Sequence, residues 1–161
     1  MPHPQTPPVR VNRLDHAAVV VADVEASRRF YVGVLGMTEV PRPAFTFGGA
    51  WFEAGGTLIH VIEQHEASGP AGNPVAEGAS ISRTRHLAFA VDDAAAIAEP
   101  LRAAGVPIVA GPKGRPDGAA QTVVLDPDGT VIELVSETGG AALRVDGAQV
   151  AEPPAGAADA G

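Results

Sequence analysis

Apolar and polar positions along residues 13–137 repeat the same order of elements twice. Each half begins with a short apolar segment, residues 14–21 and 85–91, whose composition favours a buried strand. A segment with helical spacing follows, and then two further apolar segments joined by a turn that contains glycine. Repetition of this kind fixes an architecture. We therefore predict an α+β fold of two tandem β-α-β-β-β modules that form a cupped mixed sheet with the helices outside.

The helices are predicted from their end signals. Asp23 precedes the first helical segment as an N-cap residue, and Gly36 stands where a C-terminal glycine ends a helix. In the second half, Asp92 or Asp93 is the expected cap and Gly105 the expected terminator. These signals predict one helix after the first strand of each module.

Two prolines mark irregular points in the second half. Pro100 falls inside the second predicted helix, where a proline removes a hydrogen bond and clashes with the preceding turn. The helix therefore either kinks there or begins later than Asp92 or Asp93. Pro127 lies within the segment Asp-Pro-Asp-Gly at 126–129, which predicts a tight turn between two strands.

Composition separates the repeated region from its flanks. The beginning of the chain is rich in proline, its end is rich in alanine, glycine and proline, and a Gly/Pro/Ser-rich stretch separates the two halves. Such segments are typical of tails and linkers. The predicted organisation is a flexible tail (1–12), one domain (13–137) built from module one (13–63), a linker (64–84) and module two (85–137), and a flexible tail (138–161).

Charge and cysteine content narrow the possible partners. The 161 residues carry a formal net charge of -8, from 11 basic and 19 acidic residues, which argues against a nucleic-acid partner. There are no cysteines, so any metal must be held by nitrogen and oxygen ligands. No apolar run approaches the roughly 20 residues that span a bilayer. We expect a cytoplasmic protein that binds no nucleic acid and no membrane.

Four residues that can bind a metal ion occupy matching positions in the two halves. His16 and His86 lie on the first strand of each module, while His60 and Glu133 lie on the last. His60 follows His16 by 44 positions, and Glu133 follows His86 by 47. If the modules pair about a pseudo-twofold axis, these four side chains converge. The pattern predicts a site for one divalent ion.

Strand alternation indicates which way these side chains point. His86 shares a strand face with Ala88 and Ala90, and the bulkier residues lie on the other face, which suits packing against a helix. The histidine-and-alanine face then suits a pocket. Glu133 lies between Ile132 and Leu134, and a carboxylate in a buried strand is costly unless it is paired, protonated or bound to a metal.

Several of these segments resemble the vicinal oxygen chelate superfamily. LDHAAVVVADVEASRRFYVGVLGM resembles the opening of its members, which include glyoxalase I, methylmalonyl-CoA epimerase, extradiol dioxygenases and the fosfomycin and bleomycin resistance proteins. RHLAFAVDD and LDPDGTVIELVSE resemble the opening and close of their second module, and RPAFTFGGAWFEAGGTLIHVIE looks like the glyoxalase-I-like branch. The resemblance covers about residues 13–137 and implies the fold more specifically than the reaction.

The resemblance carries the family's metal ligands onto particular residues. Its first-strand ligands fall on His16 and His86, and its last-strand glutamate falls on Glu133. The remaining ligand of bacterial glyoxalase I is a glutamate, whereas this chain has His60, which argues against lactoylglutathione lyase activity itself. Family members bind small molecules and often dimerise, so the resemblance implies a homodimer with one Zn, Ni, Co, Mn or Fe ion.

Three functions remain open on this sequence. We favour an enzyme, a lyase or isomerase of glyoxalase type, whose substrate chelates the metal through vicinal oxygens, with Glu133 or neutral His60 as catalytic base. The same two histidines and glutamate around Fe(II) would suit an extradiol-type dioxygenase. A non-enzymatic antibiotic-binding protein would instead line the cup with Trp51, Phe47 and Phe52, although core packing is the more ordinary role for those rings.

Four further polar residues lie near the ends of the predicted strands and could bind an anionic substrate: Arg42, Lys113, Arg115 and Gln121. Solvated surface positions are the more ordinary interpretation of such residues, so they are not part of the predicted catalytic set.

Overall fold

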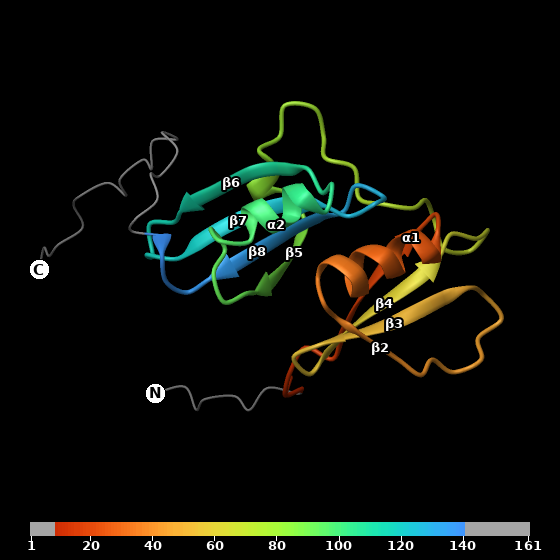
Figure 1. The fold of residues 1–161 in the computed structure, drawn as a ribbon. Helices are drawn as coiled ribbons and strands as arrows, with labels where there is room; N and C mark the ends of the chain where they lie inside the picture. The colour runs from red at the N-terminus through yellow and green to blue at the C-terminus, as the bar shows by residue number, and fades with distance from the viewer. Residues whose placement is uncertain (1–8, 141–161) are drawn as a thin grey trace, which may run out of the picture. The chain divides into compact units, whose positions relative to one another are not determined.

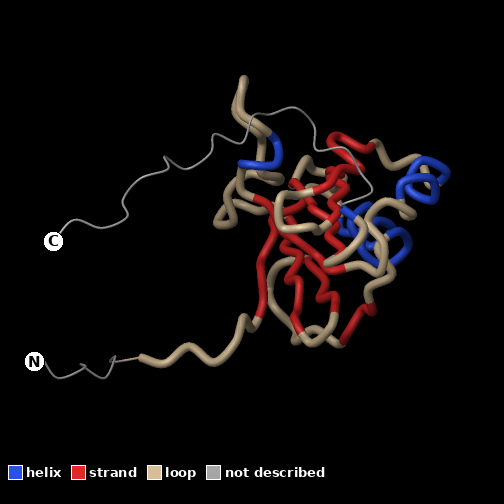
Figure 2. Tube along the Cα trace, turned by 90° about the vertical axis from the view of Figure 1, so that its left-hand side faces the viewer, coloured by secondary structure: helices blue, strands red, loops and turns tan. Residues whose placement is uncertain are grey.

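The computed structural model describes residues 9–140, which form two compact units. Unit 1 contains residues 9–85 together with Leu125–Val131, and unit 2 contains His86–Val124 together with residues 132–140. Residues 9–15 lead to the first strand as a loop (Figure 2). Most of both predicted tails, residues 1–8 and 141–161, lies outside the described residues.

Unit 1 is a four-stranded sheet with one helical segment (Figure 1). Its strands follow the spatial order β1-β4-β3-β2. β1 pairs with β4 in parallel, and the other neighbours pair antiparallel. The elements are β1 (His16–Val21), α1 (Val24–Arg28), a π-helical turn η1 (Arg29–Val34), β2 (Thr38–Val40), β3 (Gly49–Ala54) and β4 (Thr57–Glu63).

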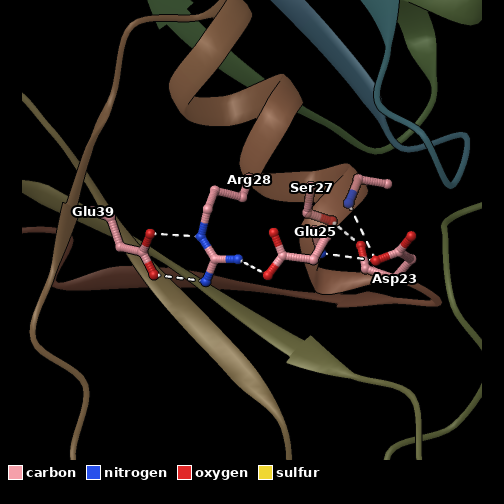
Figure 3. A network of polar contacts seen from close by, with 6 residues as sticks. Asp23, Glu25, Ser27, Arg28 and Glu39 are labelled. Carbon is pink, nitrogen blue, oxygen red and sulfur yellow. Dashed lines mark hydrogen bonds and ion pairs between the residues drawn. The ribbon is translucent and has the colours of Figure 1, made fainter.

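The predicted end signals of the first helix are confirmed. The Asp23 side chain accepts hydrogen bonds from the backbone N–H groups of Glu25 and Ala26, which α1 would otherwise leave unpaired. Arg28 then ties the helix to β2 (Figure 3), since its Nε and Nη2 lie 2.7 and 2.9 Å from the two carboxylate oxygens of Glu39. Gly36 ends the helical segment with φ +73°, a conformation that favours glycine.

One face of the unit 1 sheet packs against the helical segment, and the other does not. Tyr31 of η1 is fully buried and stacks on Phe52 of β3, with ring centroids 5.7 Å apart. Ile59 and Val61 of β4 belong to the same buried layer. Because side chains alternate along a strand, the neighbouring position His60 faces the other side of the sheet.

Unit 2 repeats the order of unit 1. Its four-stranded sheet has the order β5-β8-β7-β6, so its first and last strands are neighbours, as in unit 1 (Figure 1). A short 3-10 turn, η2 (Ile81–Arg83), precedes it. Its elements are β5 (His86–Ala90), α2 (Ala98–Ala103), β6 (Ile108–Gly114), β7 (Ala120–Leu125) and β8 (Val131–Ser136). The predicted pair of β-α-β-β-β repeats is confirmed.

The second helix begins later than either predicted cap. Asp93 does accept hydrogen bonds from the N–H groups of Ala95 and Ala96, but these belong to a turn that precedes α2. Pro100 is therefore the third residue of α2, in the first turn, where backbone N–H groups have no partner within the helix. Of the two predicted alternatives, a kinked helix and a later start, the structure shows the later start.

The turn between β7 and β8 belongs to unit 1. Within it, Asp126 Oδ1 accepts hydrogen bonds from the N–H groups of Asp128 and Thr130, which closes the predicted turn. Its other oxygen accepts a hydrogen bond of 2.9 Å from the hydroxyl of buried Tyr31. Burial raises the pKa of the Asp126 carboxyl above its ordinary value.

None of the helices in residues 9–140 has the length and apolar character of a membrane-spanning segment.

Candidate functional site

The open face of the unit 1 sheet carries a stack of three rings from three neighbouring strands. His16 of β1 lies against His60 of β4, with centroids 4.0 Å apart and planes 14° from parallel. Trp51 of β3 covers the other side of His60 at 4.2 Å and 5°. Trp51 and His60 are direct partners in the β3–β4 ladder, so strand register brings these rings together.

The two histidines of this stack have different surroundings. The Nδ1 atom of His16 lies 2.9 Å from the carboxylate of Asp15, and hydrogen bonding to His16 lowers the pKa of that carboxyl. A carboxylate in this position fixes the ring orientation and leaves Nε2 as the outward atom. The Nε2 of His60, in contrast, is buried and has no hydrogen-bond partner among the described residues. Desolvation, followed by the neighbouring His16, lowers the pKa of His60, so its imidazole is neutral at neutral pH.

A cationic and aromatic cluster continues this face on the loop between β2 and β3. The guanidinium carbon of Arg42 lies 4.7 Å from the ring centroid of Phe45 and 5.0 Å from that of Phe47. Arg42 also donates a hydrogen bond of 2.8 Å to the carbonyl of Phe47. Gly49 permits this close packing, since a Cβ there would lie 2.3 Å from the carbonyl oxygen of Val61 and 3.4 Å from Arg42 Nε.

In unit 2, His86 and Glu133 lie on the neighbouring strands β5 and β8. Glu133 is buried at 6 % exposure, and its Oε2 lies 3.9 Å from Nε2 of His86. Its Oε1 is 3.4 Å from Nη1 of Arg115, whose Nη2 is held by Asp117 at 2.7 Å. The buried carboxylate that the sequence singled out is therefore paired with a cation.

The structure thus brings the four predicted metal ligands together as two pairs, His16 with His60 in unit 1 and His86 with Glu133 in unit 2. Within residues 9–140, neither unit by itself groups three histidine or carboxylate side chains closely enough to hold a metal ion. The exposure pattern of β5 confirms the predicted faces, because His86, Ala88 and Ala90 are exposed while the residues between them are partly buried. Phe52, by contrast, is fully buried in the core.

The four polar residues near the strand ends are less solvated than surface positions usually are. None of them is exposed: Gln121 is buried, and Arg42, Lys113 and Arg115 are partly buried. Arg115 and Asp117 are two positions apart, and an arginine and an aspartate at that spacing can pair across a turn. That spacing indicates the ion pair between Arg115 and Asp117. Only the fold shows that Arg115 also reaches Glu133, which lies 18 positions further along the chain.

Comparisons with known proteins agree on one family. The model of the Glyoxalase/Bleomycin resistance protein/Dioxygenase superfamily matches residues 13–134. A curated relative named Glyoxylase I 4, from Arabidopsis thaliana, is 27% identical over 132 residues, which are 79% of this chain and 72% of the relative.

Solved structures of similar fold cover most of the chain. A glyoxalase family protein from Bacillus anthracis has a TM-score of 0.63 at 27% identity, covering 80% of this chain and 97% of its own. A glyoxalase/dioxygenase from Nostoc punctiforme has a TM-score of 0.64 at 26% identity, covering 86% of this chain and 100% of its own. With two β-α-β-β-β repeats and a family match over residues 13–134, this chain belongs to the glyoxalase, bleomycin resistance and dioxygenase superfamily, the vicinal oxygen chelate group that its sequence resembles.

Proposed function

We propose that this chain is a divalent-metal-dependent lyase or isomerase of glyoxalase type. One observation carries the proposal: neighbouring first and last strands hold one pair of metal-competent side chains in each unit. In unit 1 the pair is His16 and His60, and in unit 2 it is His86 and Glu133. The proposed substrate is a small molecule that binds the ion through two adjacent oxygens.

The chemistry of the donors fits a divalent ion. His16 has the carboxylate partner on one ring nitrogen that metal-binding histidines commonly have, which leaves the other nitrogen available. Glu133 supplies a buried carboxylate beside His86. Imidazole and carboxylate ligands suit Zn, Ni, Co, Mn and Fe. His16, His86 and Glu133 are the proposed principal ligands.

His60 is the proposed base, with ligation as its second possible role. Its ring lies parallel to that of His16, and the lone pair of each imidazole lies in its own ring plane, so in this arrangement the two rings do not point to one shared atom. Its lowered pKa keeps it neutral and able to accept a proton. Its buried Nε2 forms no hydrogen bond with any of the described residues.

The proposed reaction is proton transfer at the carbon next to a carbonyl. When bound, the ion would supply Lewis-acid stabilisation of the charge that develops on the substrate oxygens. His60 or Glu133 would take the proton and return it at the neighbouring position. Arg115 would hold Glu133 through its Oε1, leaving Oε2 toward His86. Trp51 would keep the His60 ring in place by stacking.

Deuterium exchange at the reacting carbon tests this function without a known substrate. Protein loaded in turn with Zn, Ni, Co or Mn is mixed in D₂O with a panel of α-hydroxyketones and thiohemiacetals, and NMR follows loss of the α-proton signal. We expect exchange that falls at least about 100-fold in the His60→Gln variant, because general-base catalysis typically contributes 10²–10⁴-fold. His3→Gln, in the proline-rich beginning of the chain, is the matched control and should leave exchange unchanged.

No exchange with any loaded metal would contradict the lyase or isomerase function. Oxygen consumption with Fe(II) and a catechol, in the absence of exchange, would replace it with the dioxygenase alternative. We also propose that the protein is a cytoplasmic homodimer. Light scattering of the purified protein would measure its oligomeric state.

A further inference from the structure

The ring stack on unit 1 is part of a longer aromatic surface, which we call the aromatic strip. It runs from β1 across β4 and β3 to the loop between β2 and β3, and then to the loop after β4. The Trp51 ring lies 6.2 Å from Phe45, Phe45 stacks on Phe47 at 5.2 Å, and Phe47 stacks on His65 at 5.1 Å. The strip therefore contains six rings: His16, His60, Trp51, Phe45, Phe47 and His65.

Core packing does not account for the outer half of the strip. Phe45 keeps 46% of its surface exposed, although phenylalanine is among the most frequently buried residues. The buried face of the same sheet already has its aromatic core in Tyr31 and Phe52. An exposed phenyl ring beside two further rings is a surface on which another planar group can stack.

The strip also contains a cation with no acidic partner. Arg42 packs on Phe45 and Phe47 and forms no ion pair with a carboxylate among the residues of 9–140. Within residues 9–140 its hydrogen bond is to the Phe47 carbonyl through Nη2, which leaves other guanidinium N–H groups to donate elsewhere. In a chain of net charge -8, an arginine without such a partner is a site for an anion from outside.

The acidic groups around the strip do not neutralise Arg42. Asp15 is engaged by Arg13 at 3.0 Å and by His16 at 2.9 Å. Glu63 is exposed on β4 and lies alongside Gly48, where a Cβ would collide with its carboxylate, yet it forms no ion pair with Arg42. The guanidinium is the positive group on this part of unit 1 that remains available.

We propose that the aromatic strip binds an aromatic carboxylate, with its ring stacked beside Phe45 and Trp51 and its anionic group on Arg42. The inference rests on the proposed function in one respect, because it names the part of the substrate that unit 1 recognises. The strip includes His16 and His60, so a ligand seated on it lies beside two of the proposed reacting side chains.

The single tryptophan of the chain makes this site directly measurable. Trp51 is that residue, so the intrinsic fluorescence of the protein reports on the strip. Metal-free protein, prepared with EDTA, is titrated with benzoate, with the uncharged benzamide and with the non-aromatic cyclohexanecarboxylate. We expect a saturable change with benzoate at a Kd at least about 10-fold lower than with either analogue, because each lacks one of the two interactions.

Variants separate the two interactions. Arg42→Gln is expected to abolish the preference for benzoate over benzamide, and Phe45→Leu to reduce the preference over cyclohexanecarboxylate. Arg29→Gln, at an exposed arginine of η1, is the matched control and should bind as the parent does. Arg42→Lys keeps the charge and should retain most of the benzoate preference, which tests the site even if Arg42→Gln folds poorly.

Equal affinity for benzoate and benzamide, or an unchanged preference in folded Arg42→Gln protein, would overturn the proposal, as would the lack of any saturable change. Because the titration uses metal-free protein, its outcome is separate from that of the exchange experiment. A protein that catalyses exchange but does not bind benzoate keeps the proposed function and loses this inference. A protein that binds benzoate but does not catalyse exchange keeps this inference and loses the proposed function.

Discussion

Glu133 shows how one residue can indicate a site before the fold is known. A carboxylate flanked by Ile132 and Leu134 on a strand implies a buried charge that needs a partner. The structure supplies Arg115 at 3.4 Å and His86 at 3.9 Å. Asp117 in turn holds Arg115, so the arginine is shared between two carboxylates and remains fixed.

Asp126 leads to a prediction about pH. Burial raises the pKa of its carboxyl above 3.8, against the hydrogen bonds that it accepts from Thr130 and Tyr31, so the folded state binds this proton more tightly than the unfolded state does. The contribution of this raised pKa to the free energy of unfolding is complete below the pKa of the unfolded state. It is lost as the pH rises through the raised pKa of the folded state. We expect the free energy of unfolding of the parent, relative to Asp126→Asn, to fall over that range. Urea unfolding of both proteins at a series of pH values measures this, and a difference that is constant or grows with pH would contradict it.

At the scale of elements, the cap at Asp23 gives a second prediction. Its side chain satisfies two N–H groups of α1, so Asp23→Ala should lower the free energy of unfolding by about 1 kcal/mol. Asp92→Ala is the control, since Asp92 is exposed and its side chain accepts no hydrogen bond from residues 9–140. Urea unfolding at neutral pH compares the two. If Asp92→Ala lowers the free energy of unfolding as much as Asp23→Ala does, the N-cap hydrogen bonds of Asp23 do not stabilise the protein as predicted.

Element existence was easier to predict than element limits. Hydrophobic period, the Asp23 cap and the glycine terminators gave both repeats correctly, because these signals act within a few residues of chain. The sequence left open whether the helix around Pro100 kinks or starts late, and it did not predict the π-helical turn η1. Both depend on how the segment packs on its sheet, as with Tyr31 against Phe52, and local patterns do not contain that information.

At the scale of the whole molecule, the repeat predicted two modules with the same order of elements, and the structure adds that the first and last strands are neighbours in each unit. It did not predict that the turn at Leu125–Val131 belongs to unit 1, because its hydrogen-bond partners there, Tyr31 and Ala22, lie 95 and 106 residues away. The sequence identified His16, His60, His86 and Glu133 as candidate ligands. It did not identify Arg115 as the cation beside Glu133, because that contact also joins separate segments of the chain. Contacts between distant segments decide such details.

The metal content of the purified protein tests the central claim most directly. Mass spectrometry should find about one equivalent of divalent metal per chain, and both His86→Ala and Glu133→Ala should lose it, while Glu137→Ala, at an exposed neighbour of β8, should keep it. No metal in the parent and no uptake from Zn, Ni, Co, Mn or Fe(II), or equal binding by Glu133→Ala, would contradict the metal-dependent function and favour a binding protein.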